Sequence, residues 1–267
     1  MKFTVTLFTL RKYSAGKVYP EVGHNSREQA YQDTVLYEWF LKQKNNDMFK
    51  INILIFLFLT GPFDDPDPLR FQSEIDELTS KEKIASTGPG GIMFLGSSSI
   101  RMWKSLEEDF EGYPVYNLGF GGSHTSDVLY YFQDLVVPYK PSLILFYEGD
   151  NDLASGKSPN GVFRDFKNFH EMVNRDLPGT EIGFIAVKPS PSRWNLRNEY
   201  EKYNSKILSY SHKKDDITFI DIYSPMTVEY GRPEPGLFLA DSLHMTPAGY
   251  DIWEKKVRSF IENEFQK

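Results

Sequence analysis

The chain has 267 residues, 40% of them hydrophobic and 25% charged, which is enough for one folded α/β domain with an extension. Its formal net charge of −7, without any basic stripe, argues against a dedicated nucleic-acid binder. The absence of cysteine excludes a thiol nucleophile, disulfide bonds and thiolate zinc sites.

Residues 1–47 differ from the rest of the chain, because they hold too few apolar residues to bury a core alone. Their segments Val22–Ser26 and Leu36–Lys44 resemble the C-terminal tail of an α/β-hydrolase, in which a Gly-His pair carries the catalytic histidine. The chain has no Gly-x-Ser-x-Gly nucleophile elbow to complete such a domain. The resemblance therefore implies an extension outside the catalytic domain, in which His24 is chemically idle.

An apolar segment follows at 48–62. It opens with Met48 and Lys50, and its uncharged run is too short to span a bilayer as a helix. The run has the length of the hydrophobic part of a signal peptide, and a buried strand is the alternative interpretation. We expect a periplasmic or secreted protein if translation starts at Met48, and a cytoplasmic one otherwise.

The main domain is predicted at 63–267. Asp67-Pro68 is a favourable helix start, and Leu69, Ile75 and Leu78 fall on one face of the helix that would follow. A glycine-rich loop, 88–91, ends this entry segment.

From residue 92 onward, short apolar runs alternate with amphipathic stretches. This alternation predicts a parallel sheet with helices on both faces. The predicted strands are Ile92–Leu95, Val115–Asn117, Leu143–Tyr147, Ile182–Val187 and Ile217–Ile220, and the predicted helices are 100–109, 124–135, 161–176, 196–213 and 246–263.

Polar residues follow the first three strands, at the edge where open parallel sheets bind ligands. Gly96–Ser99 puts hydroxyls on a tight turn that opens a helix, although serines there can simply cap the helix. Gly119–Ser126 lets the backbone approach a ligand, or forms a plain βα turn. In Glu148–Asp152, Asn151 can donate to an oxyanion, while turn formation is the alternative role.

A histidine with a nearby carboxylate precedes the last predicted helix. Asp241 lies three residues before His244, so it can orient the imidazole while His244 takes a proton from a serine. His170 and His212 fall in or near helical patterns and are interpreted as surface or packing residues, and His124 neighbours the glycine turn as an ambiguous lining residue. A serine, a His–Asp pair and oxyanion donors form the set that acyl transfer needs.

The four blocks together resemble the SGNH hydrolases, also called GDSL esterases, over about residues 90–262. The resemblance implies a flavodoxin-like three-layer αβα sandwich and no metal or other cofactor. It assigns Asp241 and His244 as the orienting acid and the general base. It assigns Ser98 as the nucleophile, and the Ser98 amide, Gly122 and Asn151 as the oxyanion donors.

The nucleophile block departs from the usual Gly-Asp-Ser, because Ser97 stands where the family has the aspartate. This change blurs which serine attacks. Ser98 keeps the Gly-x-Ser register, and Ser99 is the alternative. In the loop after the fourth strand, Arg193 and Trp194 suit a sugar or another polar alcohol as the leaving group.

We therefore expect a serine esterase for small acyl esters, above all acetyl esters of carbohydrates, with no nucleic-acid partner and no stable membrane span. The oligomeric state is left open. One rival is a non-catalytic ligand-binding module on the same fold, motivated by the altered nucleophile block and the extension. The other is a metal-dependent phosphoesterase with Asp150, Asp152, Asp241 and His244 as ligands.

Overall fold

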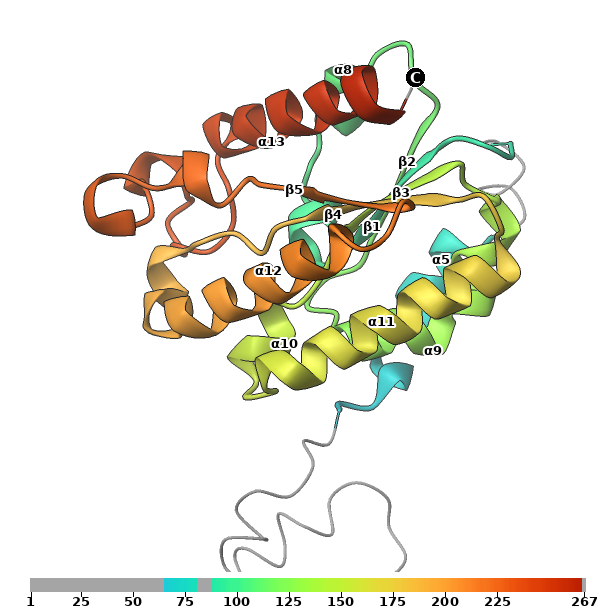
Figure 1. The fold of residues 1–267 in the computed structure, drawn as a ribbon, viewed down its shortest axis with the longest axis horizontal. Helices are drawn as coiled ribbons and strands as arrows, with labels where there is room; N and C mark the ends of the chain where they lie inside the picture. Colours follow the sequence, from blue (N-terminus) through green and yellow to red (C-terminus); the bar gives the residue numbers. More distant parts are fainter. Residues whose placement is uncertain (1–64, 81–87, 266–267) are drawn as a thin grey trace, which may run out of the picture. The chain divides into compact units, whose positions relative to one another are not determined.

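Figure 1 shows the computed structural model, which describes residues 65–80 and 88–265. The chain divides into two units, Met1–Asp67 and Pro68–Lys267, and all elements named below belong to the second unit. The predicted extension at 1–47 and the signal-like segment at 48–62 lie outside the described residues. Both therefore stay predictions, as does the boundary at residue 63.

The core of the domain is one five-stranded parallel sheet in the order β2-β1-β3-β4-β5. The order is that of flavodoxin-like folds, so the predicted α/β fold class is confirmed. The strands are β1 (Ile92–Gly96), β2 (Val115–Gly119), β3 (Leu143–Tyr147), β4 (Glu181–Ile185) and β5 (Ile217–Ile220).

The central strands are apolar without interruption because both faces of the sheet are covered. Every residue of β1 and β3 is buried. Alternate side chains enter opposite cores, with Met93 and Leu95 in one cluster and Ile92 and Phe94 in the other. This burial explains why apolar runs located the strands in the sequence.

Helices cover both faces of the sheet (Figure 1). One core cluster packs under α5, α9, α11 and α12, and the other packs under α7, α8 and α13. The helices are α5 (Gln72–Leu78), α7 (Ser98–Arg101), α8 (Leu106–Asp109), α9 (Thr125–Leu135), α10 (Asp150–Ala154), α11 (Pro159–Asp176), α12 (Arg197–Ser211) and α13 (Pro247–Phe260). Short 3₁₀ turns cover Pro68–Phe71, Val137–Tyr139, Pro191–Leu196, Ser224–Met226, Glu229–Gly231 and Pro235–Leu237, and a π turn covers Ile261–Phe265.

The helix predicted at 100–109 is wrong as one element, because α7 and α8 are separate. Trp103 lies between them, 1% exposed, and its ring packs on Phe94 and Trp253. Its indole N–H donates to the Asp109 carboxylate at 2.5 Å. Burial of this large side chain with its N–H satisfied takes precedence over continuing the helix.

The entry helix and β4 also differ from prediction at their ends. A 3₁₀ turn, Pro68–Phe71, precedes α5, and Leu69 is 55% exposed rather than on the buried face with Ile75. β4 ends at Ile185 instead of Val187, although the Ala186 amide still donates to the Ile220 carbonyl at 3.0 Å. Within 65–80 and 88–265, no helix is both long and apolar enough to cross a membrane.

Candidate active site

The candidate site lies where the first three strands meet. The chain passes from β1 to β2 on one side and then crosses to β3 on the other side of β1. In open parallel sheets, a ligand crevice forms outside the carboxyl ends of the strands at such a reversal. The segments that carry Ser98, Gly122 and Asn151 follow these three strands in turn.

Ser98 begins α7 after a tight turn at Gly96. The Gly96 φ angle is +148°, and a Cβ atom added there would lie 2.0 Å from the Tyr147 carbonyl oxygen. Glycine is therefore required at this close approach of β1 to β3. The Ser97 amide donates to the same carbonyl at 3.2 Å, which holds the turn that presents Ser98.

Exposure distinguishes the three serines of this turn. Ser97 and Ser99 are each 2% exposed, whereas Ser98 is partly exposed. The Ser99 carbonyl accepts a hydrogen bond from the Tyr250 hydroxyl at 2.9 Å, which ties this residue to α13. The Ser98 amide, at the first position of α7, has no acceptor within the described part of the chain. Ser98 is thus the serine that a ligand can reach.

His244 lies between Ser98 and Asp241. Its Nδ1 is 2.6 Å from Asp241 Oδ2, and its Nε2 is 3.0 Å from Ser98 Oγ. The other carboxylate oxygen of Asp241 accepts the amides of Leu243 and His244, each at 2.9 Å. The aspartate therefore closes an Asx turn that orients the histidine with respect to its own backbone.

The hydrogen bond with His244, followed by the Leu243 amide, lowers the pKa of Asp241 to about 2. The carboxylate is consequently ionised over the neutral range. An ionised carboxylate at Nδ1 keeps a proton on that nitrogen and leaves Nε2 to accept the proton of a serine hydroxyl.

Gly122 and Asn151 each offer an N–H group at the same edge of the sheet. Gly122 has a φ angle of +80°, and its amide has no acceptor among residues 65–80 and 88–265. Asn151 lies in α10, and its Nδ2 donates to the Ser123 carbonyl at 3.0 Å. A side-chain amide carries two N–H donors, so one remains for a ligand. With the Ser98 amide, the site offers three donors of the kind used for oxyanions.

A buried ionic cluster lies beside Asn151. Asp150 is 4% exposed and accepts hydrogen bonds from Lys188 at 2.9 Å, from Tyr200 at 2.6 Å and from Arg193. Burial alone would raise the pKa of Asp150, but Lys188 and Arg193 outweigh it and hold that pKa well below its ordinary value. Asp150 is therefore an ionised carboxylate that links Lys188, Arg193 and Tyr200 through hydrogen bonds.

The GDSL-like lipase/acylhydrolase family matches residues 88–252, which is more than half of the sequence. The chain belongs to this family. The membership makes it a carboxylic ester hydrolase of the SGNH type, as its sequence blocks predicted. No curated protein matches the sequence.

Solved structures share the fold of this acylhydrolase at low sequence identity. A candidate platelet activating factor from Streptococcus pneumoniae is 18% identical with a TM-score of 0.64, covering 81% of this chain and 100% of its own. A GDSL-like lipase from Bacteroides thetaiotaomicron is 22% identical with a TM-score of 0.58, covering 73% and 97%. A mutant of an acetylxylan esterase from Geobacillus stearothermophilus is 13% identical with a TM-score of 0.52, covering 66% and 94%.

Two of the ligands of the metal-dependent alternative, Asp150 and Asp152, lie beside cationic side chains in this acylhydrolase. The Asp150 carboxylate is bound by Lys188 and Arg193, and Asp152 Oδ1 is 3.9 Å from Lys157 Nζ. Both Asp152 oxygens also accept the Thr125 amide, at 3.2 and 3.1 Å. Carboxylates already paired with cationic side chains are poor ligands for a hard cation.

Arg193 and Trp194, predicted to contact substrate, lie in the turn before α12. The Arg193 guanidinium hydrogen-bonds Asp150 and donates to Asn151 Oδ1 at 3.0 Å. Trp194 is partly exposed, with the Arg197 guanidinium 5.1 Å from its ring centroid. Their substrate roles stay predictions, as do the catalytic roles of Ser98, Gly122, Asn151, Asp241 and His244.

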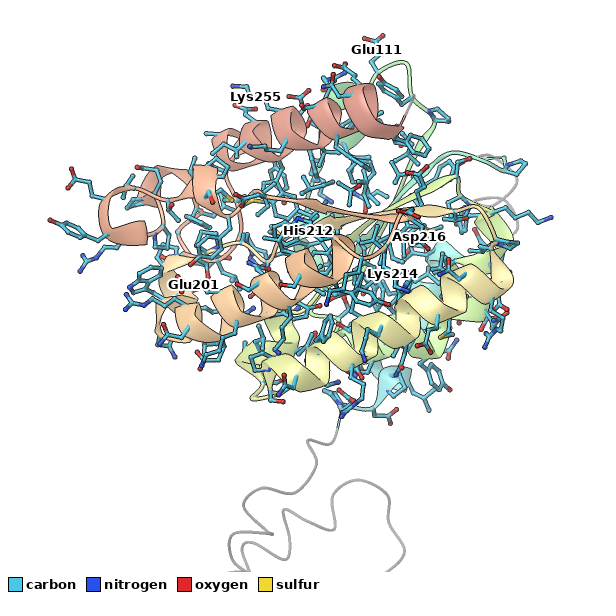
Figure 2. The ribbon with its side chains drawn as sticks, viewed as in Figure 1. Glu111, Glu201, His212, Lys214, Asp216 and Lys255 are labelled. Carbon is cyan, nitrogen blue, oxygen red and sulfur yellow. The ribbon has the colours of Figure 1, made fainter. Side chains whose placement is uncertain are left out.

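Three further histidines lie in the described part of the chain. His170 is buried, 2.8 Å from Asp216, which precedes β5 at the amino edge of the sheet, and His212 is exposed at the end of α12 (Figure 2). His124 is 5% exposed, and its backbone amide donates to Asp127 at the start of α9.

Sequence reasoning missed the buried residues that hydrogen-bond around Asp150 and Asn151, above all Ser123, Glu148, Lys188 and Tyr200. Glu148 is fully buried, 2.5 Å from the Ser123 hydroxyl in the loop that carries Gly122. The signal available in the sequence was a pair of charged residues, Glu148 and Lys188, at the ends of apolar strands. Such residues in a buried position require partners.

Proposed function

We propose that this acylhydrolase is a serine esterase for small acyl esters, above all acetyl esters of carbohydrates or other polar alcohols. The observation that carries the proposal is the contact chain from Asp241 through His244 to Ser98, the one partly exposed serine of the turn 97–99. The alternative of a non-catalytic binding module gives no reason for a histidine held at 3.0 Å from an accessible hydroxyl.

In the proposed mechanism, His244 Nε2 takes the Ser98 proton as the hydroxyl oxygen attacks the ester carbonyl. The negative charge on the carbonyl oxygen is stabilised by the amides of Ser98 and Gly122 and by the Asn151 side chain. His244 then gives the proton to the departing alcohol, and water hydrolyses the acyl-enzyme with the same histidine as base. Asp241 stays ionised and orients the imidazole.

The preference for a polar alcohol rests on the Arg193–Trp194 turn. The Trp194 ring, with the Arg197 guanidinium 5.1 Å from its centroid, suits a hydroxyl-rich leaving group better than a long alkyl chain. One protein of this fold is an acetylxylan esterase, which makes acetylated xylan oligosaccharides suitable test substrates.

The deciding experiment is labelling by a fluorophosphonate probe, with hydrolysis of 4-nitrophenyl acetate measured alongside. We expect the wild type to label and turn over. Ser98→Ala should lose the label and several orders of magnitude in rate, because the triad acts as a unit. Ser99→Ala is the matched control and should keep both.

Each contrary result has a clear meaning. Labelling retained in Ser98→Ala and lost in Ser99→Ala would move the nucleophile by one residue. A wild type that neither labels nor hydrolyses any acyl ester would leave the binding-module alternative.

A further inference from the structure

We infer that Arg193 is a positioning residue, which fixes the Asn151 side-chain amide in the one orientation that can serve an oxyanion. The inference rests on the proposed function, because it assigns Asn151 the role of an oxyanion donor. Arg193 Nη2 donates to Asn151 Oδ1 at 3.0 Å, and Asn151 Nδ2 donates to the Ser123 carbonyl at 3.0 Å.

The two contacts of Asn151 select the same amide orientation for independent reasons. A guanidinium can only donate, so it must face Oδ1, and a backbone carbonyl can only accept, so it must face Nδ2. A flipped Asn151 would lose both hydrogen bonds and turn its oxygen toward the developing negative charge. Without Arg193, only the Ser123 carbonyl would oppose that flip.

Arg193 is itself held in place by buried charges. The Asp150 carboxylate accepts hydrogen bonds from Arg193, from Lys188 Nζ at 2.9 Å and from the Tyr200 hydroxyl at 2.6 Å. Lys188 is 1% exposed and Asp150 is 4% exposed, so neither ion moves freely into water. Two cations around one carboxylate leave one positive charge beside Asn151, which strengthens its N–H groups as donors.

The segment that carries Arg193 also contacts the other half of the site. The Ser192 amide donates to the Ser242 carbonyl at 3.1 Å, inside the turn between Asp241 and His244. Ser242 has a φ angle of +59°, a left-handed conformation that needs support when the residue is not glycine. The turn after β4 thus connects the oxyanion asparagine to the acid–base pair.

The test is a double-mutant cycle on the full chain, with kcat and KM measured for 4-nitrophenyl acetate. Arg193→Met keeps the length of the side chain and removes its donors. We expect it to lower kcat by about 10- to 100-fold with little change in KM. Asn151→Ala should cost roughly 10²- to 10³-fold. In the Asn151→Ala background, Arg193→Met should change kcat by less than about threefold, because the group that it positions is gone.

Two outcomes would overturn the inference. An equal loss of kcat from Arg193→Met in both backgrounds would mean that Arg193 acts independently of Asn151. A rise in KM alone would make Arg193 a substrate contact. Arg175→Met, which removes an exposed arginine from α11, is the matched control and should leave both constants unchanged.

A second variant guards against misfolding. Arg193→Lys keeps an ion pair with Asp150, but one ammonium group cannot hold Asp150 and Asn151 with the geometry of a guanidinium fork. It should lose kcat as Arg193→Met does, and a wild-type kcat would contradict the inference. Ser98→Ala is assayed in parallel. If it and Ser99→Ala both stay active, the proposed function fails. If Ser98→Ala is inactive while the cycle is additive, only the role of Arg193 fails.

Discussion

Asp241 carries out two tasks with its two carboxylate oxygens. One closes the Asx turn on the Leu243 and His244 amides, and the other contacts His244 Nδ1 at 2.6 Å. An asparagine could keep the turn, since its carbonyl oxygen also accepts, but it would present an NH₂ group to the imidazole. That group would stabilise the tautomer with the proton on Nε2, which cannot accept the proton of Ser98.

We therefore expect Asp241→Asn to fold normally and to lower kcat by up to about 10⁴-fold. The folded pKa of Asp241, about 2, is below its ordinary value, so the wild-type carboxylate stays charged as the pH falls until that value is approached. The wild-type kcat should accordingly stay above that of the variant throughout the range from about pH 5 to pH 9. A variant with the same kcat as the wild type at the acid end of this range would contradict the low pKa of Asp241.

Asp221→Asn is the matched control for this substitution. Asp221 Oδ1 accepts the amides of Tyr223 and Ser224, each at 3.0 Å, so it closes an Asx turn of the same kind without a histidine partner. Its replacement should leave kcat unchanged. A similar loss in both variants would assign the effect to the turns and not to the imidazole.

At the scale of elements, α7 is held against the end of β2 by direct backbone contact. A Cβ atom added to Gly119 would lie 2.2 Å from the Arg101 amide nitrogen and 2.8 Å from the Ile100 carbonyl carbon. The Asn117 side chain donates to the Ile100 carbonyl at 2.8 Å and accepts the Gly119 amide at 3.0 Å. The position of Ser98 at the start of α7 depends on this contact.

Gly119→Ala should destabilise the protein by about 1–3 kcal/mol, because backbone atoms cannot move aside as a flexible side chain does. It should also lower kcat by shifting α7. Urea unfolding and the esterase assay measure the two effects. Gly236→Ala is the control, since the nearest atom to its added Cβ is Glu234 Oε1 at 3.8 Å, and unchanged stability in both variants would refute the close contact.

At the scale of the whole molecule, folding buries carboxyl groups that the unfolded chain exposes. Burial first, and then the charge of Asp152, raises the pKa of Glu148 well above its ordinary value. Burial likewise raises the pKa of Asp152 to about 7, against the opposing effect of Lys157. A protonated Glu148 can donate to the Ser123 hydroxyl oxygen, while that hydroxyl donates to the Phe120 carbonyl at 3.0 Å.

The raised pKa of Glu148 makes stability depend on pH. Between its ordinary and folded values, the folded protein holds a proton that the unfolded chain has released, so the free energy of unfolding falls as pH rises. Glu148→Gln removes this titration and keeps an NH₂ donor for Ser123. We expect the Tm of the variant, relative to wild type, to rise from about pH 5 to pH 9.

Thermal unfolding at both pH values is the measurement, with the exposed Glu107→Gln as control. The control should follow the wild type at both pH values. Parallel Tm curves for Glu148→Gln and the wild type would show that Glu148 is ionised in the folded state.

Local patterns were sufficient for the strands and for the His244 turn. A strand buried on both faces must be apolar throughout, so Leu143–Tyr147 was identified with its observed bounds. Asp241 and His244 are three residues apart, so their turn forms from hydrogen bonds within the segment itself. The α10 helix, by contrast, lies in a stretch whose composition also suits a turn, and composition could not separate the two.

The sequence by itself determined the α/β class, the family and the residue types available for acyl transfer, because apolar periodicity and short motifs are local properties. Only the tertiary structure decided which serine is accessible, because the burial of Ser97 and Ser99 depends on elements packed around α7. It also decided the partner of Arg193, since Asn151 is reached only when β3 and β4 lie side by side. Contacts between distant segments follow from strand order and packing, which no short stretch of sequence encodes.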